Sequence, residues 1–459
     1  MEAIASFFKF AERGTNFATE VKAGVATFMV MVYIVAVNPG ILSAALPPGS
    51  DVQAFLVAAA AATALVAGIM SIAMGVFANY PIALAAGLGI NAVVAFGLAL
   101  GAGLGLAGAM GVIVWEGIVV LVLVLVGLRE AIMNAVPLSL KRAIGVGIGL
   151  FILFIGFFDG GLINSPTCFA LPCPAPGVPP VEFKFPNSWA TWLTVIGLAI
   201  TIILYVRKVP AALVLSIIIT SVIALLVGVT TVPSNLLQGP NFSTLGQFDL
   251  GAVFGTLGVL GAILTIFSIM LTDFFDTMGT ATAIGEQAGL AKEDGKLPGV
   301  GRVLLVDSAA AIAGGAAGIS SNTSYIESAA GVAEGGRTGL TAIVVGLLFL
   351  LMIFLSPLVA LVPFQATAPV LILVGFLMCS LIKDIDFLDF EEGFPALLGL
   401  ILMPITFSIT VGIGAAFVSY VFIKIVVGKW RAVHPLMWVV AIAFAVYFGQ
   451  TAIQSILPR

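Results

Sequence analysis

Two acidic residues, Asp276 and Glu327, stand in sequence that is otherwise apolar or rich in small hydroxyl side chains. Asp276 belongs to Thr272–Thr280 (TDFFDTMGT), and Glu327 belongs to Gly318–Gly331 (GISSNTSYIESAAG). A carboxyl group can accept hydrogen bonds from N–H groups or carry a proton, and neighbouring hydroxyls can both donate and accept. These residue types therefore predict a polar site for a small molecule or an ion.

The composition places this site inside a membrane. Of the 459 residues, 61% are hydrophobic and 9% are charged, whereas soluble globular proteins carry about 25% charged residues. Apolar stretches long enough for a hydrocarbon core of ~30 Å recur from Val21 to Ile453. We therefore interpret the chain as one all-α, polytopic membrane domain without a sizeable soluble part. The net charge of −4 and the lack of a basic run argue against nucleic acid as a partner.

Hydropathy and charge together predict fourteen membrane elements. Lys and Arg accumulate on the cytoplasmic side of membrane proteins, and a cytoplasmic N-terminal lead at 1–20 puts most basic residues in inner loops. Residues 394–427 would make one helix of about 50 Å, which is too long, so we expect two short helices. A further terminal helix is expected at 433–451. The fourteen elements are 21–44, 52–76, 80–99, 105–127, 139–158, 188–206, 210–229, 257–285, 299–318, 321–335, 338–361, 366–383, 394–409 and 411–427.

The acidic residues in these elements are costly, because a charge at the bilayer centre costs about 2.5–3.5 kcal/mol on insertion scales. This cost favours a function over a structural role for Asp276 and Glu327. Asp273 lies three residues before Asp276, so the two share a helix face. For Asp273 and for the buried Glu116, functional and structural roles stay equally open. Asp307 is interpreted as structural.

Two elements are predicted to be broken. The run Ser320–Ser324 is a poor helix former, so we expect a short extended stretch followed by a half-helix beginning near Tyr325. Its counterpart in the first half is Asn79–Asn91, which contains a proline and close glycines. Irregular backbone at membrane depth survives only where it is buried or lines a cavity. Broken helices at corresponding places in two halves indicate a transport site.

An internal repeat supports this interpretation. Val136-Pro137 followed by Gly149 is echoed by Val362-Pro363 followed by Gly375 at the same spacing. The copies are seven elements apart, and an odd number inverts the second copy in the membrane. Inverted repeats with broken helices are a common plan of secondary transporters.

Three segments carry a resemblance to a known family. They are Asn79–Asn91, Asp273–Thr280 (DFFDTMGT) and Thr323–Thr341 (TSYIESAAGVAEGGRTGLT). They resemble the AzgA-like branch of the nucleobase–cation symporters, the adenine/guanine/hypoxanthine permeases. The resemblance covers nearly the whole chain, and the third segment is the most specific. The family usually has a proline where this chain has Ala86.

That resemblance implies a cell-membrane transporter of seven plus seven inverted elements, with purine bound between broken elements 3 and 10 and against element 8. Members of the family are often homodimers. The implied parts are a core domain at 21–127 and 257–361, a gate domain at 128–229 and 362–427, and a C-terminal helix and tail at 428–459. The residues expected to bind substrate are Asp276, Glu327, Asn91, Thr277, Thr323, Tyr325, Ile326 and Phe274.

Coupling to an ion is the remaining expectation. Desolvated carboxyl groups can take up a proton near neutral pH, so Asp273, Asp276 and Glu327 are candidates for carrying a coupled proton. Sodium is the rival ion, since Thr, Ser and Asp oxygens also bind hard cations. Anion transport of the sulfate type ranks lower, because the acidic residues would repel an anion. We expect no enzyme activity, cofactor or metal site, since the chain has one His and no nucleophile–base arrangement. A disulfide between Cys168 and Cys173 stays open.

Overall fold

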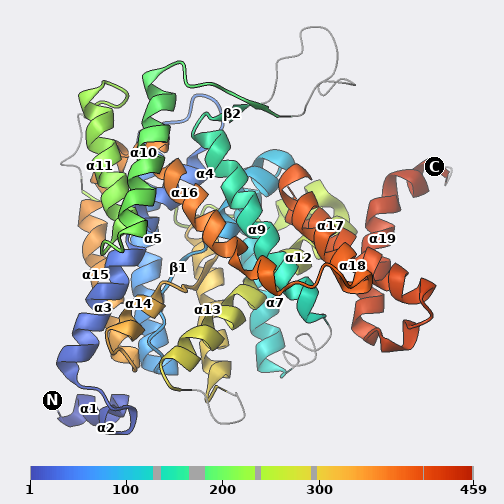
Figure 1. The fold of residues 1–459 in the computed structure, drawn as a ribbon, viewed down its shortest axis with the longest axis horizontal. Coiled ribbons are helices and arrows are strands. Elements are labelled where there is room, and N and C mark those ends of the chain that lie inside the picture. Colours follow the sequence, from blue (N-terminus) through green and yellow to red (C-terminus); the bar gives the residue numbers. More distant parts are fainter. Residues whose placement is uncertain are drawn as a thin grey trace.

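The protein is a bundle of helices. The computed structural model describes residues 2–127, 136–164, 181–232, 239–290, 297–406 and 408–456. Within these ranges, nine helices are long and apolar enough to cross a membrane. Most of them run alongside one another between two opposite ends of the molecule, and the N-terminus lies at one of these ends (Figure 1). The chain is therefore an integral membrane protein, as its composition predicted.

The first half of the chain, before residue 230, contains the elements from α1 to α11. The helix η1 and the helix η2 are π-helices that continue α5 and α6. The elements are α1 (Glu2–Phe8), α2 (Phe10–Arg13), α3 (Phe17–Met31), α4 (Ile34–Ser43), α5 (Val52–Ala73), η1 (Met74–Ala78), β1 (Leu84–Ala86), α6 (Leu88–Ala92), η2 (Val93–Gly101), α7 (Gly105–Leu125), α9 (Leu138–Asp159), β2 (Ile163–Asn164), β3 (Glu182–Phe183), α10 (Trp189–Val206) and α11 (Ala212–Leu226).

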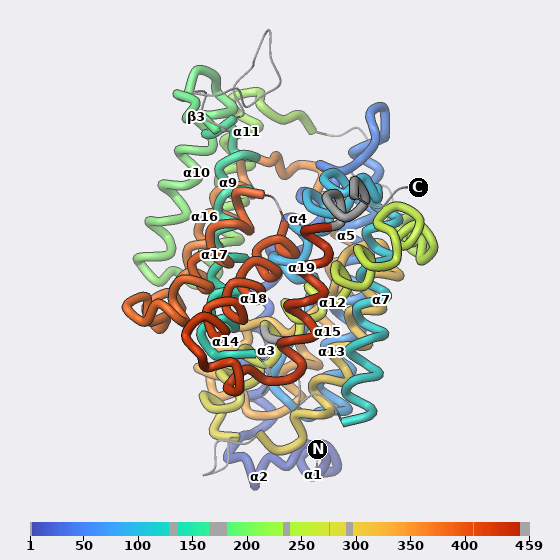
Figure 2. Tube along the Cα trace, turned by 90° about the vertical axis from the view of Figure 1, so that its right-hand side faces the viewer, coloured from blue at the N-terminus to red at the C-terminus, as the bar shows by residue number. Residues whose placement is uncertain are grey.

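The second half begins with the longest helix. Its elements are α12 (Leu250–Gln287), α13 (Val300–Ala316), β4 (Asn322–Ser324), α14 (Ser328–Ala333), α15 (Gly339–Met352), η3 (Ile353–Leu361), α16 (Phe364–Met378), η4 (Cys379–Asp384), α17 (Phe390–Thr406), α18 (Ile409–Val426), η5 (Trp430–Ala432) and α19 (Pro435–Ile456). The helix α19 lies at the right-hand edge of the bundle in Figure 1 and faces the viewer in Figure 2. Its Phe444 ring meets Phe417 of α18 edge to face.

Most predicted boundaries agree with these elements within a few residues, and two differ in an informative way. The first span begins at Phe17 rather than 21, because the Asn16 side chain accepts a hydrogen bond from the Thr19 amide and caps the helix earlier. The lead that precedes it is itself helical. The helix α12 begins at Leu250 rather than 257, and Gly258 breaks it with φ 68° and ψ 168°.

The two helices expected within 394–427 are present as α17 and α18. The side chain of Ser408 caps the start of α18 by accepting a hydrogen bond from the Val411 amide. Lys424, near the end of α18, lies 2.7 Å from a carboxylate oxygen of Glu391, at the start of α17. The two helices are therefore antiparallel, and the chain returns to the side from which it came. Cys168 and Cys173 lie outside the described residues.

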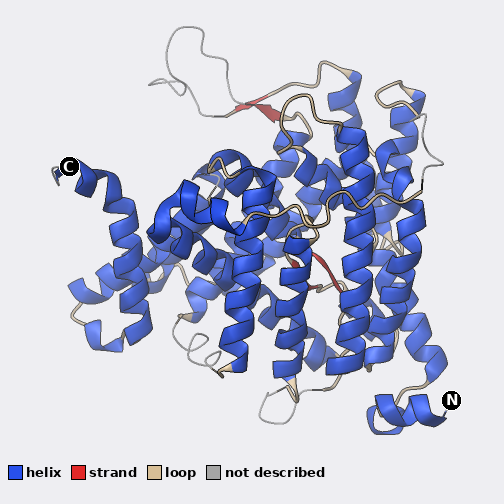
Figure 3. Cartoon of the chain, turned by 180° about the vertical axis from the view of Figure 1, so that it is seen from behind, coloured by secondary structure: helices blue, strands red, loops and turns tan. Residues whose placement is uncertain are grey.

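The predicted extended stretches exist and pair with each other. The strands β1 and β4 are antiparallel, with Leu84 opposite Ser324 and Ala86 opposite Asn322. All six strand residues are buried, and Figure 3 shows the pair in red among the helices in the interior of the bundle. The backbone polar groups beside the strands are also paired, since the Tyr325 amide donates to the Ala83 oxygen and the Gly87 amide to the Ser321 oxygen. This pairing is what buried irregular backbone requires.

The repeat predicted from sequence is visible in the packing of α9 against α16. A Cβ on Gly149 would lie 2.8 Å from the carbonyl oxygen of Gly375, and a Cβ on Gly375 would lie 2.6 Å from that of Gly149. The equivalent glycines of the two copies thus face each other where α9 packs on α16, and an added Cβ on either would come too close to the backbone of the other. The strands β1 and β4 are likewise equivalent in the repeat. The fold is the predicted seven-plus-seven inverted repeat with two broken elements.

Candidate functional site

A cavity of about 90 Å³ lies beside the paired strands. Three segments form most of its wall: the backbone of Gly87–Ile90 after β1, one face of α12, and the connection from β4 to α14. The side chains of Ile148 on α9 and of Val374 and Met378 on α16 close the remaining side. The residues Thr272, Asp276 and Thr280 come from α12, Thr323 and Ser324 come from the end of β4, and Tyr325, Ile326 and Glu327 come from the connection.

Five of the predicted site residues line this cavity. They are Asp276, Thr323, Tyr325, Ile326 and Glu327. Asp276 is exposed, and it faces this cavity from the middle of α12, whereas Glu327 is partly buried at the start of α14. None of the lining residues is Lys or Arg. Two carboxyl groups with hydroxyl and backbone groups therefore give the cavity an excess of hydrogen-bond acceptors and an acidic lining.

The carboxyl of Glu327 is oriented by a tyrosine from the first half of the chain. The hydroxyl of Tyr33 donates to Glu327 Oε1 at 2.8 Å. Tyr33 itself is 2% exposed and stands where α3 passes into α4. The Tyr325 hydroxyl donates to the Ala86 carbonyl oxygen at 2.5 Å, which holds its ring beside the cavity. Ala86 thus binds Tyr325 through its carbonyl oxygen and also pairs with Asn322 in the strands.

Three further predicted residues lie near the cavity without lining it. Asn91, on α6, is fully buried, and neither polar atom of its side chain has a hydrogen-bond partner among the described residues. Phe274 belongs to the main apolar core. Thr277 follows Asp276 on α12, and its hydroxyl donates to Asp307 Oδ2 at 2.7 Å and lies 2.8 Å from the Thr323 hydroxyl. Their part in substrate binding stays a prediction.

Asp307 supports the strand that carries the cavity. Its Oδ1 atom accepts from both the amide and the hydroxyl of Ser324, each at 2.8 Å. Together with the bond from Thr277, these contacts tie α13, α12 and β4 to one buried carboxyl. These bonds are consistent with the structural role expected for Asp307. Through them Asp307 positions β4, the strand that leads to Glu327.

Asp273 lies one turn before Asp276 and is buried rather than exposed to the cavity. Its Oδ2 accepts from the Ser321 hydroxyl at 2.9 Å, directly before β4. Its carboxyl also contacts the carboxyl of Glu116 on α7. Among the described residues, no ion pair involves either group or the two cavity carboxyls.

Sequence reasoning did not single out Tyr33, Thr272 or Thr280 as site residues. Thr272 and Thr280 stand four residues before and after Asp276, so helical periodicity alone places them on the same face. Tyr33 is different, because no sequence spacing links it to Glu327. Only the packing of α3 against α14 brings the two residues together.

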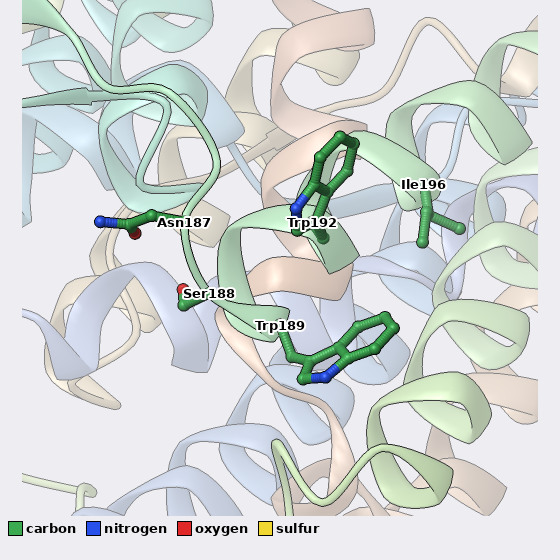
Figure 4. A pocket seen from close by; sticks show the side chains of 5 residues that line it. All are labelled: Asn187, Ser188, Trp189, Trp192 and Ile196. Atoms are coloured by element: carbon green, nitrogen blue, oxygen red, sulfur yellow. The ribbon is translucent and has the colours of Figure 1, made fainter.

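A second, larger hollow of about 430 Å³ lies far from these carboxyls, at the start of α10. It is lined by Asn187, Ser188, Trp189, Trp192 and Ile196 (Figure 4). Trp189 and Trp192 are 63% and 49% exposed. Exposed tryptophans at one end of a membrane helix are typical of the lipid–water interface. This hollow is therefore a feature of the outer surface rather than part of the buried site.

Broken helices that pair at the centre of an inverted repeat, beside a cavity with carboxyl groups, define a membrane transporter of the permease class. The chain belongs to the permease family, which it matches over residues 18–421. It is 41% identical to the adenine permease AdeQ of Escherichia coli over 96% of this chain and 95% of that protein. It is 39% identical to the guanine/hypoxanthine permease PbuG of Bacillus subtilis over 96% and 99%. The family predicted from the sequence is thus confirmed.

Solved structures share the fold at low sequence identity. The transmembrane domain of a cyanobacterium bicarbonate transporter, BicA, has a TM-score of 0.59 and 16% identity over 87% of this chain and 96% of that one. The anion transporter Slc26a9 of the mouse, in an inward-facing state, has a TM-score of 0.59 and 11% identity over 90% and 69%. These likenesses concern the architecture alone.

Proposed function

We propose that this permease carries purine nucleobases, namely adenine, guanine or hypoxanthine, into the cell by proton symport. The observation that supports this most directly is the cavity in which Asp276 and Glu327 lie beside the backbone of two broken helices. A purine presents N–H donors and ring-nitrogen acceptors along its edges. Carboxylates accept from the donors in charge-assisted bonds, and hydroxyls and backbone amides serve the acceptors. Relatives called adenine and guanine/hypoxanthine permeases agree with this cargo.

The walls of the cavity come from both of the predicted domains. Gly87–Ile90, Asp276 and Glu327 belong to the proposed core, whereas Ile148, Val374 and Met378 belong to the proposed gate. The cavity thus lies where the proposed core and gate meet. A movement of the gate against the core would open the cavity to one side of the membrane and then to the other. At about 90 Å³ the cavity is smaller than typical ligand pockets of ~300 Å³ or more, so substrate entry requires such a movement.

Proton coupling follows from the charge of the site. Asp273, Asp276 and Glu327 have no basic partner among the described ion pairs, and an uncompensated carboxylate in a membrane is costly. A proton taken up with the substrate would neutralise one carboxylate. That would lower the cost while the loaded site turns from one side of the membrane to the other. Coupling to sodium is the alternative within the same function.

Anion transport is the second candidate, because the structures that share the fold include bicarbonate and anion transporters. The lining of the cavity argues against it. Its two carboxyl groups repel an anion, and no lining residue carries a positive charge.

Uptake of labelled adenine, guanine and hypoxanthine by cells lacking their own purine transporters tests the proposal. Uracil, xanthine, sulfate and bicarbonate serve as competitors, and an uncoupler removes the proton gradient. We expect purines to enter and compete with one another, and the uncoupler to abolish accumulation. Uptake that only sulfate or bicarbonate inhibits would contradict the proposed cargo. Accumulation that persists with the uncoupler and depends on sodium would contradict proton coupling.

A further inference from the structure

Glu116 is a carboxylic acid that the proposed site does not use. It lies in the middle of α7 and is 0% exposed. Neither of its carboxyl oxygens has a hydrogen-bond donor among the described residues. The close packing of α7 on α13 explains the burial, since a Cβ on the adjacent Gly117 would lie 3.1 Å from the Ser308 carbonyl oxygen. An ionised carboxylate without a donor at this depth would cost several kcal/mol.

The polar group that Glu116 contacts is the carboxyl of Asp273 on α12. The helices α7 and α12 pack against each other and bring the carboxyl of Glu116 beside that of Asp273. Asp273 Oδ1 lacks a donor just as both oxygens of Glu116 do. Ionised carboxylates only accept hydrogen bonds, so two of them in contact cannot bond. When one of the pair is protonated, its O–H donates to the other and satisfies both. The contact therefore makes chemical sense only with a proton between the two groups.

The other elements packed against this pair add no compensating positive charge. From α13 the facing titratable group is Asp307, and on α12 itself it is Asp276, both acidic. Arg302, the basic residue of α13, is exposed near the start of that helix. The helix η2 carries no titratable residue, and β4 and the residue before it contribute the hydroxyls of Thr323 and Ser321.

The pair is connected to the cavity on two sides. Asp273 stands one turn before Asp276 on α12. Through its other oxygen, Asp273 holds the Ser321 hydroxyl at 2.9 Å, and Ser321 accepts from the Gly87 amide through its carbonyl oxygen. Both Gly87 and the residues after Ser321 form the wall of the cavity. A displacement of Asp273 would therefore be transmitted to both broken elements.

We propose that Glu116 and Asp273 form a carboxyl–carboxylate pair that holds one shared proton, and that this is the proton coupled to transport. Loss of the proton leaves two negative charges in contact inside the membrane, so the carboxyls separate and Asp273 changes its hold on Ser321. Uptake of the proton restores the pair and the geometry of the strands. This inference rests on the proposed symport, and it adds Glu116 to the coupling machinery. A sodium ion fits less well, because the two carboxyls contact each other directly.

Purified full-length protein in proteoliposomes provides the test. The variant Glu116→Gln keeps the size of the side chain and can donate to Asp273, but it cannot release a proton. Glu116→Asp keeps the acid, and Glu286→Gln removes an exposed acid from the same helix as Asp273 as a control. Two quantities are measured: exchange of labelled against unlabelled purine without a pH gradient, and accumulation driven by a gradient with acid outside. Proton entry is followed with an entrapped pH dye.

A gradient of one pH unit stores about 1.4 kcal/mol per proton, which supports about tenfold accumulation with one proton per base. We expect wild type and Glu286→Gln to approach this value and to admit protons with the purine. Glu116→Gln should still exchange purine but reach only the outside concentration, with no purine-dependent proton entry. Glu116→Asp should recover part of the coupling. Tenfold accumulation with proton entry in Glu116→Gln would overturn the inference.

A measurement without substrate separates this inference from the proposed function. Infrared spectroscopy of the reconstituted protein should show the C=O stretch of a protonated carboxyl that is lost in Glu116→Gln and in Asp273→Asn. If the wild type transports no purine, the proposed function fails, and the infrared band still decides whether the pair holds a proton. If the band is unchanged in both variants, the pair is wrong even where purine uptake is confirmed. Sodium-driven uptake that Glu116→Gln abolishes would also overturn the proton assignment.

Discussion

The hydroxyl of Tyr33 donates a hydrogen bond of 2.8 Å to Glu327 Oε1, which joins the first membrane element to the half-helix beside the cavity. This bond fixes the position of a carboxyl that we propose binds the substrate. Because Oε1 accepts this bond, the protein rather than the ligand sets the direction in which the other carboxyl oxygen, Oε2, points.

Removing this bond should weaken substrate binding. In Tyr33→Phe the ring stays and the donor is lost, and a hydrogen bond to a charged group contributes about 1.5–3 kcal/mol. We expect the KM for the preferred purine to rise by about tenfold or more, with a smaller change in maximal rate. Radiolabelled uptake at several purine concentrations measures both. Tyr447→Phe on α19 is the matched control, and an unchanged KM in Tyr33→Phe would show that the bond does not position the site.

The two cavity carboxyls should be needed for transport. Asp276→Asn and Glu327→Gln keep the shapes of the side chains but replace a charge-assisted acceptor with a neutral amide. We expect each variant to lose purine uptake while its amount in the membrane stays normal, as measured by uptake assays and immunoblots of the same cells. The exposed Glu286→Gln, also on α12, should behave as wild type. Normal uptake by both cavity variants would rule out this site.

Gly89 should be required where the proposed core meets the proposed gate. A Cβ at this position would lie 2.5 Å from Cγ2 of Ile148, which is closer than side chains allow. Because Ile is branched at Cβ and stiff, Gly89→Ala should push α9 away from the cavity and reduce uptake severalfold. Gly279→Ala is the control, since nothing lies within 4 Å of its added carbon. Full activity in Gly89→Ala would show that the contact is not part of the transport cycle.

Glu20 should stabilise the fold without taking part in transport chemistry. Its buried carboxylate accepts from the amides of Arg337, Thr338 and Thr341 and from the Thr341 hydroxyl, which joins α3 to the start of α15. Glu20→Ala leaves these donors unpaired, and we expect a loss of about 3 kcal/mol or more in unfolding free energy. Thermal unfolding in detergent measures this as a lower Tm. Glu12→Gln, whose side chain is 66% exposed beside Lys9, should leave Tm unchanged.

Much of the fold could be predicted because the membrane imposes simple rules. Apolar length and the placement of Lys and Arg located the spans, and they favoured two helices over one at 394–427, where α17 and α18 occur. The poor helix propensity of Ser320–Ser324 located the extended stretch, which is β4 at Asn322–Ser324. The equivalent glycines Gly149 and Gly375 indicated the repeat and face each other in the structure.

The sequence by itself determined which residues lie at membrane depth, since a carboxyl such as Asp276 or Glu327 is conspicuous among apolar neighbours. Tertiary structure alone decided their partners. It placed Tyr33 against Glu327, turned Thr277 toward Asp307, buried Asn91 outside the cavity wall and brought Glu116 to Asp273. The physical reason is that depth follows from local hydropathy, whereas a contact between distant helices depends on how their small residues pack.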